Sequence, residues 1–314
     1  MNTKKIKKSK NNFLSTGKDL RLDILIELTR DTIRKARKME LDKYGVHPRR
    51  YALLLALQDI GDTATPTELS RRLIRKRHSV SELLSKMEKD GLIKKVKDLA
   101  RKNMIRIILT KKGRKLSNLA SRQESIHIIL SSLNKRKLQR LKILLEKVRD
   151  SILKTHDLER SVPQLRTYNL DYDVFLLLIE TTDEINRLRQ AELNRYGIHH
   201  RRAALLRVMK DIHERATAVE IANRLGRERN SVSELMNKME RDGLVKKVKD
   251  LENKKMIRFL LTEKGRKAYD QSNRHTNIVE IISTLSKKEH QELESNLLTL
   301  YNKALKEIGI NGLR

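Results

Sequence analysis

Apolar residues recur every three or four positions along most of the chain, which is the spacing of amphipathic helices. The clearest run, over residues 19–43, places six residues on one face: Leu22, Leu25, Ile26, Thr29, Ile33 and Ala36. Pro is nearly absent, so little in the chain interrupts such helices. Helices are therefore predicted in the first half at residues 19–43, 47–60, 65–73, 78–90, 111–130 and 135–155.

Between the fourth and fifth of these helices the apolar period changes to that of a strand. Gly91 can adopt the left-handed backbone that stops a helix, and residues 92–96 and 104–109 then alternate as two strands. A polar loop at 97–103 joins them. Two helices separated by a short turn at 74–77, followed by a hairpin with a basic loop, predict a winged helix-turn-helix.

The pattern occurs twice, because residues 44–115 repeat at 196–267, 152 positions later, without a gap and with roughly three residues in five identical. The second copy predicts helices at 171–195, 199–213, 218–225, 229–242, 263–284 and 287–308, and a hairpin over 245–261. We therefore expect a mainly α chain of two tandem winged helix-turn-helix domains, at residues 18–155 and 169–314. A basic, disordered arm at 1–17 and a linker at 156–168 complete the expected organisation.

The charge of the chain indicates a polyanionic partner. Lys and Arg number 71 against 40 Asp and Glu, which gives a formal net charge of +31. Because basic residues recur at matched places in both copies, nucleic acid explains them better than a generally basic, solvated surface does. A membrane surface ranks lower, since no apolar run approaches the ~20 residues of a membrane span. The start of the chain lacks the apolar core of a signal peptide, so we expect a cytoplasmic protein.

Missing residue types narrow the function further. The chain has no Cys or Trp, three Phe and seven Tyr, so it offers no thiol chemistry and no series of stacking platforms for single strands. It has no glycine-rich phosphate loop, spaced histidine pair or serine elbow, and we expect neither an enzyme nor a cofactor or metal. His47 recurs as His199, but a local hydrogen bond at a helix start explains them better than a metal or a sensor. A duplex read through its grooves and phosphates is the favoured target.

The second helix of each predicted helix-turn-helix leaves a polar face free to enter the major groove of DNA. Basic residues before this helix and at the wing tip would grip phosphates. In the first copy the candidate DNA-binding residues are Arg75, Arg77, His78, Ser79, Ser81, Glu82, Ser85, Lys86, Arg101 and Lys102. In the second copy they are Arg227, Arg229, Asn230, Ser231, Ser233, Glu234, Asn237, Lys238, Asn253, Lys254 and Lys255. These faces lack the exposed apolar residues that a protein-binding winged helix would need.

These residues resemble the winged helix-turn-helix of the MarR (multiple antibiotic resistance regulator) family. The resemblance is carried by Thr67-Glu68-Leu69-Ser70, Ser79-Val80-Ser81, the run Lys86 to Ile93, Asp98 and Leu109-Thr110-Lys111-Lys112-Gly113, and by their second-copy counterparts. It implies dimers joined through the first and last helices, palindromic operators, frequent repression, and small phenolic or anionic effectors. Which effector this chain would bind cannot be read from its residues.

Two departures from the family pattern matter. Where the family commonly has Asp-Arg at the wing tip, this chain has Arg101-Lys102 and Asn253-Lys254, so lysine would replace the minor-groove arginine. Both halves also lie in one chain, so the expected dimer would be an internal pseudo-dimer, and about a dozen linker residues can span roughly 40 Å. The alternative is a homodimer of the fused chain, with four wings.

The two copies differ at positions that would face DNA. Ser81, Glu82 and Lys86 recur in the second copy. In contrast, the residues Lys76, His78, Ser85 and Arg101 are replaced by Glu228, Asn230, Asn237 and Asn253. We therefore expect a transcriptional regulator, usually repressing, that reads an imperfect inverted repeat in double-stranded DNA. An architectural, weakly specific DNA-coating protein is the alternative, and solvated positions without a role in reading would fit it.

Overall fold

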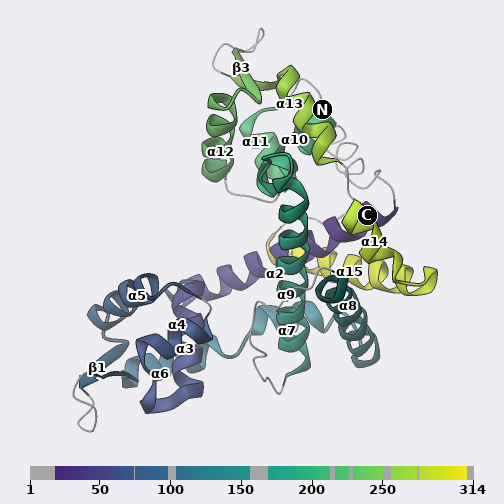
Figure 1. Ribbon diagram of the computed structural model, residues 1–314. Helices are drawn as coiled ribbons and strands as arrows, with labels where there is room; N and C mark the ends of the chain where they lie inside the picture. Colours follow the sequence, from purple (N-terminus) through teal and green to yellow (C-terminus); the bar gives the residue numbers. More distant parts are fainter. Residues whose placement is uncertain are drawn as a thin grey trace.

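The structure is a computed structural model that describes residues 18–73, 75–97, 104–155, 169–212, 216–225, 229–249, 256–273 and 276–309. The predicted arm at 1–17, the predicted linker at 156–168 and both wing tips lie outside these residues. The described part is mainly helical, with two small antiparallel sheets (Figure 1). None of its helices combines the length and the apolar character that crossing a membrane requires.

The first repeat, residues 18–155, contains helices and one hairpin in the predicted order. Its elements are α2 (Lys18–Lys43), α3 (Pro48–Ile60), η2 (Gly61–Thr63), α4 (Pro66–Arg72), α5 (Arg77–Lys89), β1 (Ile93–Lys97), β2 (Ile105–Leu109), α6 (Lys111–Ala120), α7 (Glu124–Leu130) and α8 (Lys135–Thr155). All six residues of the predicted apolar face of α2 are buried.

The second repeat, residues 170–307, follows the same order. Its elements are α9 (Leu170–Asn194), α10 (His200–Ile212), α11 (Ala218–Leu225), α12 (Arg229–Arg241), β3 (Val245–Lys249), β4 (Ile257–Leu261), α13 (Glu263–Ser272), α14 (Thr276–Ser283) and α15 (Lys287–Glu307). Each of these begins and ends within one residue of its counterpart 152 positions earlier. The repeat therefore extends in the structure beyond residues 44–115 to the terminal helices.

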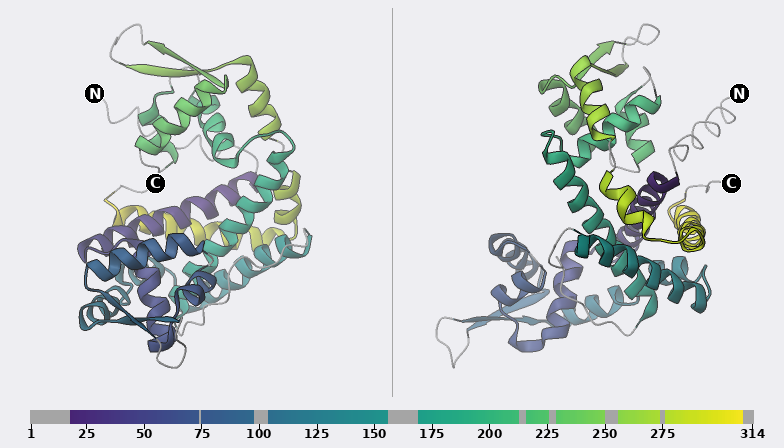
Figure 2. Two further views of the ribbon diagram at one scale, coloured as in Figure 1. Left: turned by 60° about the vertical axis from the view of Figure 1, so that its left-hand side comes forward. Right: turned by 45° about the vertical axis from the view of Figure 1, so that its right-hand side comes forward.

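The buried apolar residues form three clusters, and these define the parts of the molecule. We call α3 to α6 the first lobe and α10 to α13 the second lobe, because each lobe contains most of one cluster. The third cluster joins α2, α7, α8, α9, α14 and α15, which we call the hub. Figures 1 and 2 show the lobes at separate ends of the hub.

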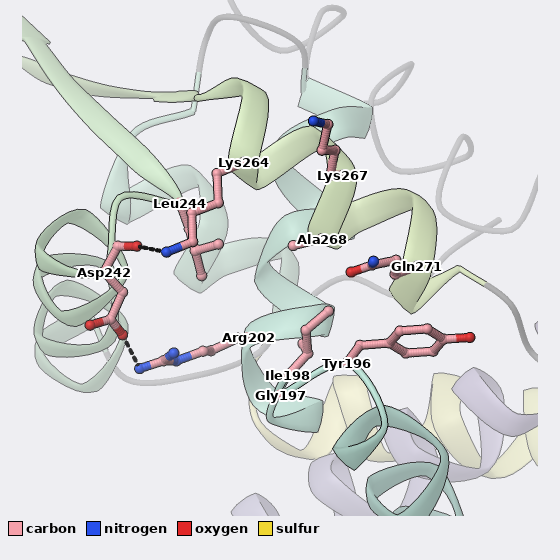
Figure 3. Close-up of a pocket in the computed structure, with 10 residues that line it drawn as sticks. All are labelled: Tyr196, Gly197, Ile198, Arg202, Asp242, Leu244, Lys264, Lys267, Ala268 and Gln271. Atoms are coloured by element: carbon pink, nitrogen blue, oxygen red, sulfur yellow. Dashed lines mark hydrogen bonds and ion pairs between the residues drawn. The ribbon is translucent and has the colours of Figure 1, made fainter.

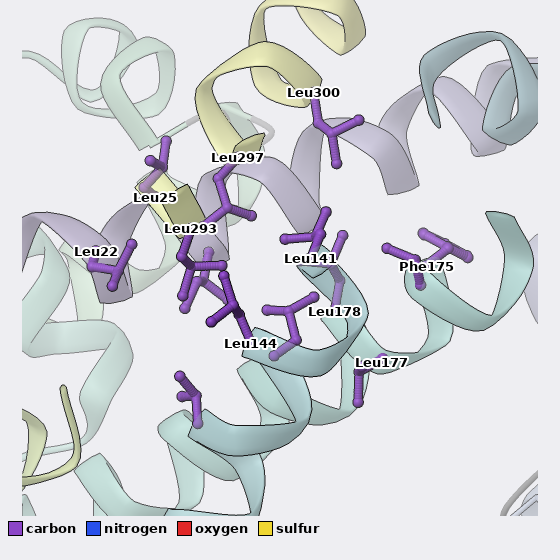
Figure 4. Packing of buried hydrophobic residues seen from close by; sticks show 14 of the residues in the cluster. Leu22, Leu25, Leu141, Leu144, Phe175, Leu177, Leu178, Leu293, Leu297 and Leu300 are labelled. Atoms are coloured by element: carbon purple, nitrogen blue, oxygen red, sulfur yellow. The ribbon is translucent and has the colours of Figure 1, made fainter. Parts of the chain in front are cut away.

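The hub is built from terminal helices that the two repeats exchange. Helix α2 of the first repeat packs along α15 of the second, and α9 of the second packs along α8 of the first. Figure 4 shows Leu22 of α2, Leu144 of α8, Leu178 of α9 and Leu293 of α15 meeting in one core. Neither repeat completes this core alone, so separating them would expose a large apolar surface. Such an exchange is the arrangement that an internal pseudo-dimer requires.

One prediction for each repeat was wrong, because the helices predicted at 111–130 and 263–284 are each two helices. In the first repeat α6 ends at Ala120 and α7 begins at Glu124, with Gln123 in the left-handed region at φ 53°. Arg37 of α2 donates to the Ala120 carbonyl, and Glu40 accepts from the backbone N–H groups of Glu124 and Ser125. The side chains of α2 thus satisfy both helix ends at the break, which an apolar pattern does not register.

Each lobe is a winged helix-turn-helix. In the first lobe Thr65 caps α4 by accepting from the Glu68 N–H, and Val80, Leu84 and Met87 turn one face of α5 into the core. Strands β1 and β2 pair antiparallel, as do β3 and β4 in the second lobe. The Ile107 N–H of β2 donates to the Ala64 carbonyl at 2.8 Å, which extends the small sheet toward α4.

Candidate nucleic-acid interface

The exposed faces of α5 and α12 carry the polar residues that the sequence places there. In the first lobe Arg75, Arg77, His78, Ser79, Ser81, Glu82 and Lys86 are exposed, and Ser85 is half-buried. In the second lobe Arg229, Asn230, Ser231, Glu234, Asn237 and Lys238 are exposed, and Ser233 is half-buried. Both helices lie on the left-hand side of the molecule in Figure 1. The other candidates, Arg101, Lys102, Arg227, Asn253, Lys254 and Lys255, lie outside the described residues.

An acidic residue lies in the middle of each exposed face and is neutralised by the next helical turn. Lys86 Nζ contacts Glu82 Oε1 at 2.6 Å, and Lys238 Nζ contacts Glu234 Oε1 at 2.7 Å. The hydrogen bond from the lysine lowers the pKa of Glu82 and of Glu234. Both carboxylates therefore stay ionised, and an ionised glutamate can accept a hydrogen bond from the amino group of cytosine in the major groove.

The two faces differ in how their variable residue is held. In the first lobe Ser85 hydrogen-bonds Lys95 Nζ of β1 at 3.2 Å, and the same amine contacts Glu88 at 2.8 Å. In the second lobe, Asn237 makes no side-chain hydrogen bond to any described residue and is exposed. The amide of Asn237 thus keeps its full capacity to bond an outside partner, whereas the Ser85 hydroxyl is already engaged.

The Asp-Gly-Leu to Leu-Thr-x-x-Gly span joins the recognition helix to the wing. Gly91 follows α5 with φ +69°, and the Thr110 hydroxyl donates to its carbonyl at 2.7 Å while accepting from the Gly113 N–H at 3.0 Å. A Cβ on Gly113 would lie 2.0 Å from the Leu92 carbonyl oxygen. Only glycine fits there, and Gly265 is equally close to the Leu244 carbonyl oxygen in the second lobe. The motif thus fixes the wing relative to the helix that would read DNA.

An ion pair that sequence reasoning missed ties the same corner to the helix before it. Arg50 of α3 contacts Asp90 at 2.6 Å, and Arg202 of α10 contacts the equivalent Asp242 at 2.5 Å. The signal was available, because both partners are identical in the two copies. These ion pairs hold the end of the recognition helix against the helix before it.

Further cations surround the turn before α5. Arg34 of α2, Arg49 of α3 and Arg75 are all exposed. Burial and the nearby charges of Arg49 and Arg34 lower the pKa of Arg75, so both of these cations repel the Arg75 guanidinium group. Sequence reasoning missed Arg34 and Arg49, since they lie on other helices. An anion such as a DNA phosphate would relieve this repulsion.

The recurring histidines act as helix caps. His47 Nδ1 accepts from the Arg49 N–H at 3.2 Å, and His199 Nδ1 accepts from the Arg201 N–H at 3.2 Å. Among the described residues no group of three or more His, Asp or Glu side chains is arranged to hold a metal ion. Burial, with Arg201 and Arg202 nearby, lowers the pKa of His199, so it is neutral at physiological pH.

A hollow of about 370 Å³ opens beside this corner in the second lobe (Figure 3). It is lined by Tyr196, Gly197, Ile198, Arg202, Asp242, Leu244, Lys264, Lys267, Ala268 and Gln271. The first repeat has Leu116 and Leu119 where the second has Ala268 and Gln271. The pair in the second lobe is therefore smaller and more polar than the pair in the first. Arg202 pairs with the Asp242 carboxylate, and Lys264 Nζ donates to the Asp242 backbone carbonyl.

Comparison with known proteins places this geometry in a family. Residues 44–102 match the MarR family model, and residues 200–265 match the model of a winged helix DNA-binding domain. The chain belongs to the MarR family. No curated protein matches it.

Two of the solved structures that are similar to the chain each match less than half of it. The organohalide-sensing RdhR-CbdbA1625 transcriptional regulator, solved with 2,4-dichlorophenol bound, is 31% identical over 44% of this chain and 82% of its own, with a TM-score of 0.37. The MepR–DNA complex of S. aureus is 22% identical over 42% of this chain and 94% of its own, with a TM-score of 0.35. This MarR chain therefore spans most of each relative with less than half of its own length.

Proposed function

We propose that this MarR chain is a sequence-specific regulator of transcription that binds double-stranded DNA and represses when bound. The observation that carries the proposal is the pair of exposed polar faces on α5 and α12, held by the same wing-anchoring contacts in both lobes. A helix of this kind has the size and polarity to enter the major groove. We infer binding rather than catalysis, and a cytoplasmic site of action.

The charge of the chain supports a large phosphate contribution to binding. A net charge of +31, with Arg34, Arg49 and Arg75 clustered beside the first recognition helix, gives many groups that can displace counterions from DNA. Such contacts set affinity and position but carry no sequence information. The net charge alone would suit an architectural DNA-coating protein equally well. Recognition of particular bases therefore has to come from the exposed faces of α5 and α12.

The exposed faces support an operator with two related but unequal half-sites. Ser81, Glu82 and Lys86 recur as Ser233, Glu234 and Lys238, and these shared residues would read a shared core. Asn230 and Asn237 can each make two hydrogen bonds to adenine, which His78 and Ser85 cannot reproduce. We infer an imperfect inverted repeat with half-sites about one helical turn apart.

The test is to select genomic fragments that the full-length protein binds and to compare their affinity with that of random DNA at one fixed salt concentration. A regulator should prefer its selected site by roughly 10³-fold or more. A ratio near one would replace the proposal with the architectural coater. Placing the selected site over a promoter then decides repression, because a repressor lowers transcription and an activator raises it.

We also propose that one chain supplies both halves of the DNA-binding unit. The exchange of α2 and α9 between the repeats supports this arrangement. The protein should then sediment as one unit of 36.8 kDa at nanomolar concentration. A stable mass near twice that value would favour the four-winged homodimer instead.

A small-molecule effector is a further part of the proposal. RdhR-CbdbA1625, the relative solved with 2,4-dichlorophenol, motivates that compound as the first probe. The hollow of the second lobe is the place to test, because Ala268→Leu restores the residue type found at Leu116 and would fill it. Dichlorophenol binding that Ala268→Leu abolishes would support an effector site there. Binding that the substitution leaves unchanged would place the effector elsewhere.

A further inference from the structure

One ion pair in the hub joins a residue to its own counterpart in the other repeat. Arg140 Nε of α8 donates to Glu292 Oε2 of α15 at 2.8 Å, and these two residues are 152 positions apart, which is the repeat offset. A residue that touches its own equivalent lies on the axis that relates the two repeats. In a pair of identical subunits such a position meets itself, so it cannot carry opposite charges on its two sides.

The charges around this axis are also divided by repeat. Glu289 of α15 accepts from Lys147 Nζ at 2.7 Å and lies 3.5 Å from Arg140 Nη2. The counterpart of Glu289 in the first repeat is Lys137, and the counterpart of Lys147 in the second repeat is Thr299. The hydrogen bond from Lys147, with that from the Ser286 N–H, lowers the pKa of Glu289 to about 2. The carboxylate is therefore fully ionised at neutral pH.

The contact between α8 and α9, which also joins the two repeats in the hub, shows the same division of charge by repeat. Helix α8 carries eight Lys and Arg against two acidic residues, whereas its partner α9 carries six Asp and Glu against two basic residues. Arg149 of α8 is buried and contacts Glu180 of α9 at 3.2 Å. The residue of the first repeat that corresponds to Glu180 is Leu28. All of these cations lie on the first repeat, and all of their inter-repeat partners lie on the second.

Pairing of like repeats would lose these contacts. Two first repeats would set Arg140 against Arg140 and Lys147 against Lys137. Buried Arg149 would face Leu28 in place of Glu180 and would keep only its neighbour Asp150 as an ionic partner. Two second repeats would set Glu292 against Glu292. Repulsive contacts of this kind are how interfaces reject wrong partners, and a buried charge without its partner is more unfavourable than an exposed one.

We propose that the hub is an interface selective for unlike repeats. Arg140 and Glu292, supported by Lys147 and Glu289, favour pairing of the first repeat with the second and disfavour pairing of two like repeats. The consequence is that every hub presents one α5 and one α12. The two recognition helices would therefore always be presented to DNA as one α5 and one α12, and never as two identical helices. This selectivity does not depend on the proposed DNA function, and its test needs no DNA.

The test begins with the intact protein, carrying a protease site inserted after Pro163 and cleaved once the chain has folded. A version with a tag on the first repeat is mixed with an untagged version, the mixture is unfolded in denaturant and refolded, and complexes captured by the tag are identified by native mass spectrometry. We expect the tagged first repeat to be recovered with a second repeat at least tenfold more often than with another first repeat. Recovery of like pairs in statistical proportion would overturn the proposal.

Charge reversal in the uncleaved chain gives an independent readout if the halves refold poorly. Arg140→Glu and Glu292→Arg should each lower the denaturant midpoint, and the double reversal should recover most of the loss, because the pair is restored in the opposite sense. Arg114→Glu is the matched control, since its exposed partner Asp62 lies within the first repeat, and Glu292→Arg should not recover any loss of midpoint that it causes. Additive losses in the double variant would contradict a specific role for this pair.

Discussion

The first and second lobes hold their recognition helices with the same contacts and present different residues on them. The Arg50–Asp90 pair recurs as Arg202–Asp242, and the Thr110 bond to the Gly91 carbonyl recurs from Thr262 to Gly243. On the exposed faces, in contrast, Ser85 is engaged by Lys95 whereas Asn237 is free of described partners. A homodimer must keep its two faces identical, because one sequence supplies both. Fusion of the two repeats in one chain removes that constraint, while the shared packing contacts still fix the position of each recognition helix.

The lobes also meet the hub through different chemistry. At the first lobe Tyr172 and Phe175 lie with ring centroids 6.1 Å apart, and Arg37 lies over the Tyr51 ring at 4.6 Å. At the second lobe Asp23 stands in the place of Phe175. Burial raises the pKa of Asp23 to about 6, although the charge of Arg207 on α10 opposes this. One junction is therefore aromatic, and the other contains a carboxyl group whose pKa is raised by burial.

The largest effect is expected from breaking a contact that the two repeats share on the hub helices α2 and α9. Arg37 and Glu40 are both buried, 2.7 Å apart, and Arg189 and Glu192 repeat the pair at 2.5 Å. Arg37→Met and Arg189→Met should each lower the free energy of unfolding by about 3 to 5 kcal/mol, because a buried carboxylate loses its partner. Arg114→Met, which breaks an exposed pair, should lower it by no more than about 1 kcal/mol. Urea denaturation measures all three, and a loss caused by only one of the two substitutions, Arg37→Met or Arg189→Met, would show that the shared contact is not equivalent in the two repeats.

The next effect concerns a position where the lobes differ. Asn237→Ser gives the second lobe the residue of the first, and it should relax base preference in one half-site by about 1 to 3 kcal/mol. Ser85→Asn is the reciprocal change and should alter the other half-site. Binding measured against single-base variants of the selected operator distinguishes the two. Changes spread evenly over both half-sites would mean that these residues do not read bases.

A smaller effect should distinguish the two hub junctions by pH. The pKa of Asp23 is raised in the folded state from 3.8 to about 6, so its contribution to stability is present below pH 3.8 and is lost as the pH rises through 6. A shift of roughly two pKa units corresponds to a loss of no more than about 3 kcal/mol, and the opposing charge of Arg207 is already included in that shift. Asp23→Asn should flatten the stability profile between pH 4 and 7. An unchanged profile in this variant would assign the pH dependence to other groups.

The smallest effect at any one salt concentration is expected from single phosphate contacts. Arg77→Gln and Arg229→Gln, at matched positions of the two lobes, should each weaken all DNA sequences about equally. Each should also reduce the slope of log affinity against log salt by roughly one unit. Lys254→Gln tests the second wing in the same way. A substitution that leaves the slope unchanged removes that residue from the interface.

Sequence patterns predicted the elements well because apolar spacing fixes which side of a helix is buried. They failed where buried charged side chains determine where a helix ends or which helices pair. Arg37 and Glu40 interrupt no apolar period, so the break between α6 and α7 that they support was invisible. The pairing of Arg140 with Glu292 depends on which helices the repeats exchange, and neither residue alone indicates it. Positions on the exposed face of α5 were readable, because solvent exposure follows directly from the buried face.

The central claim is that the fused repeats read two unequal half-sites, and competition among three DNA duplexes tests it most directly. One duplex carries the selected operator, and the other two are perfect palindromes built from its left and right halves. At one salt concentration the native operator should bind more tightly than either palindrome, because each palindrome matches one lobe and mismatches the other by about 1 to 3 kcal/mol. Equal affinity for all three duplexes would contradict the account.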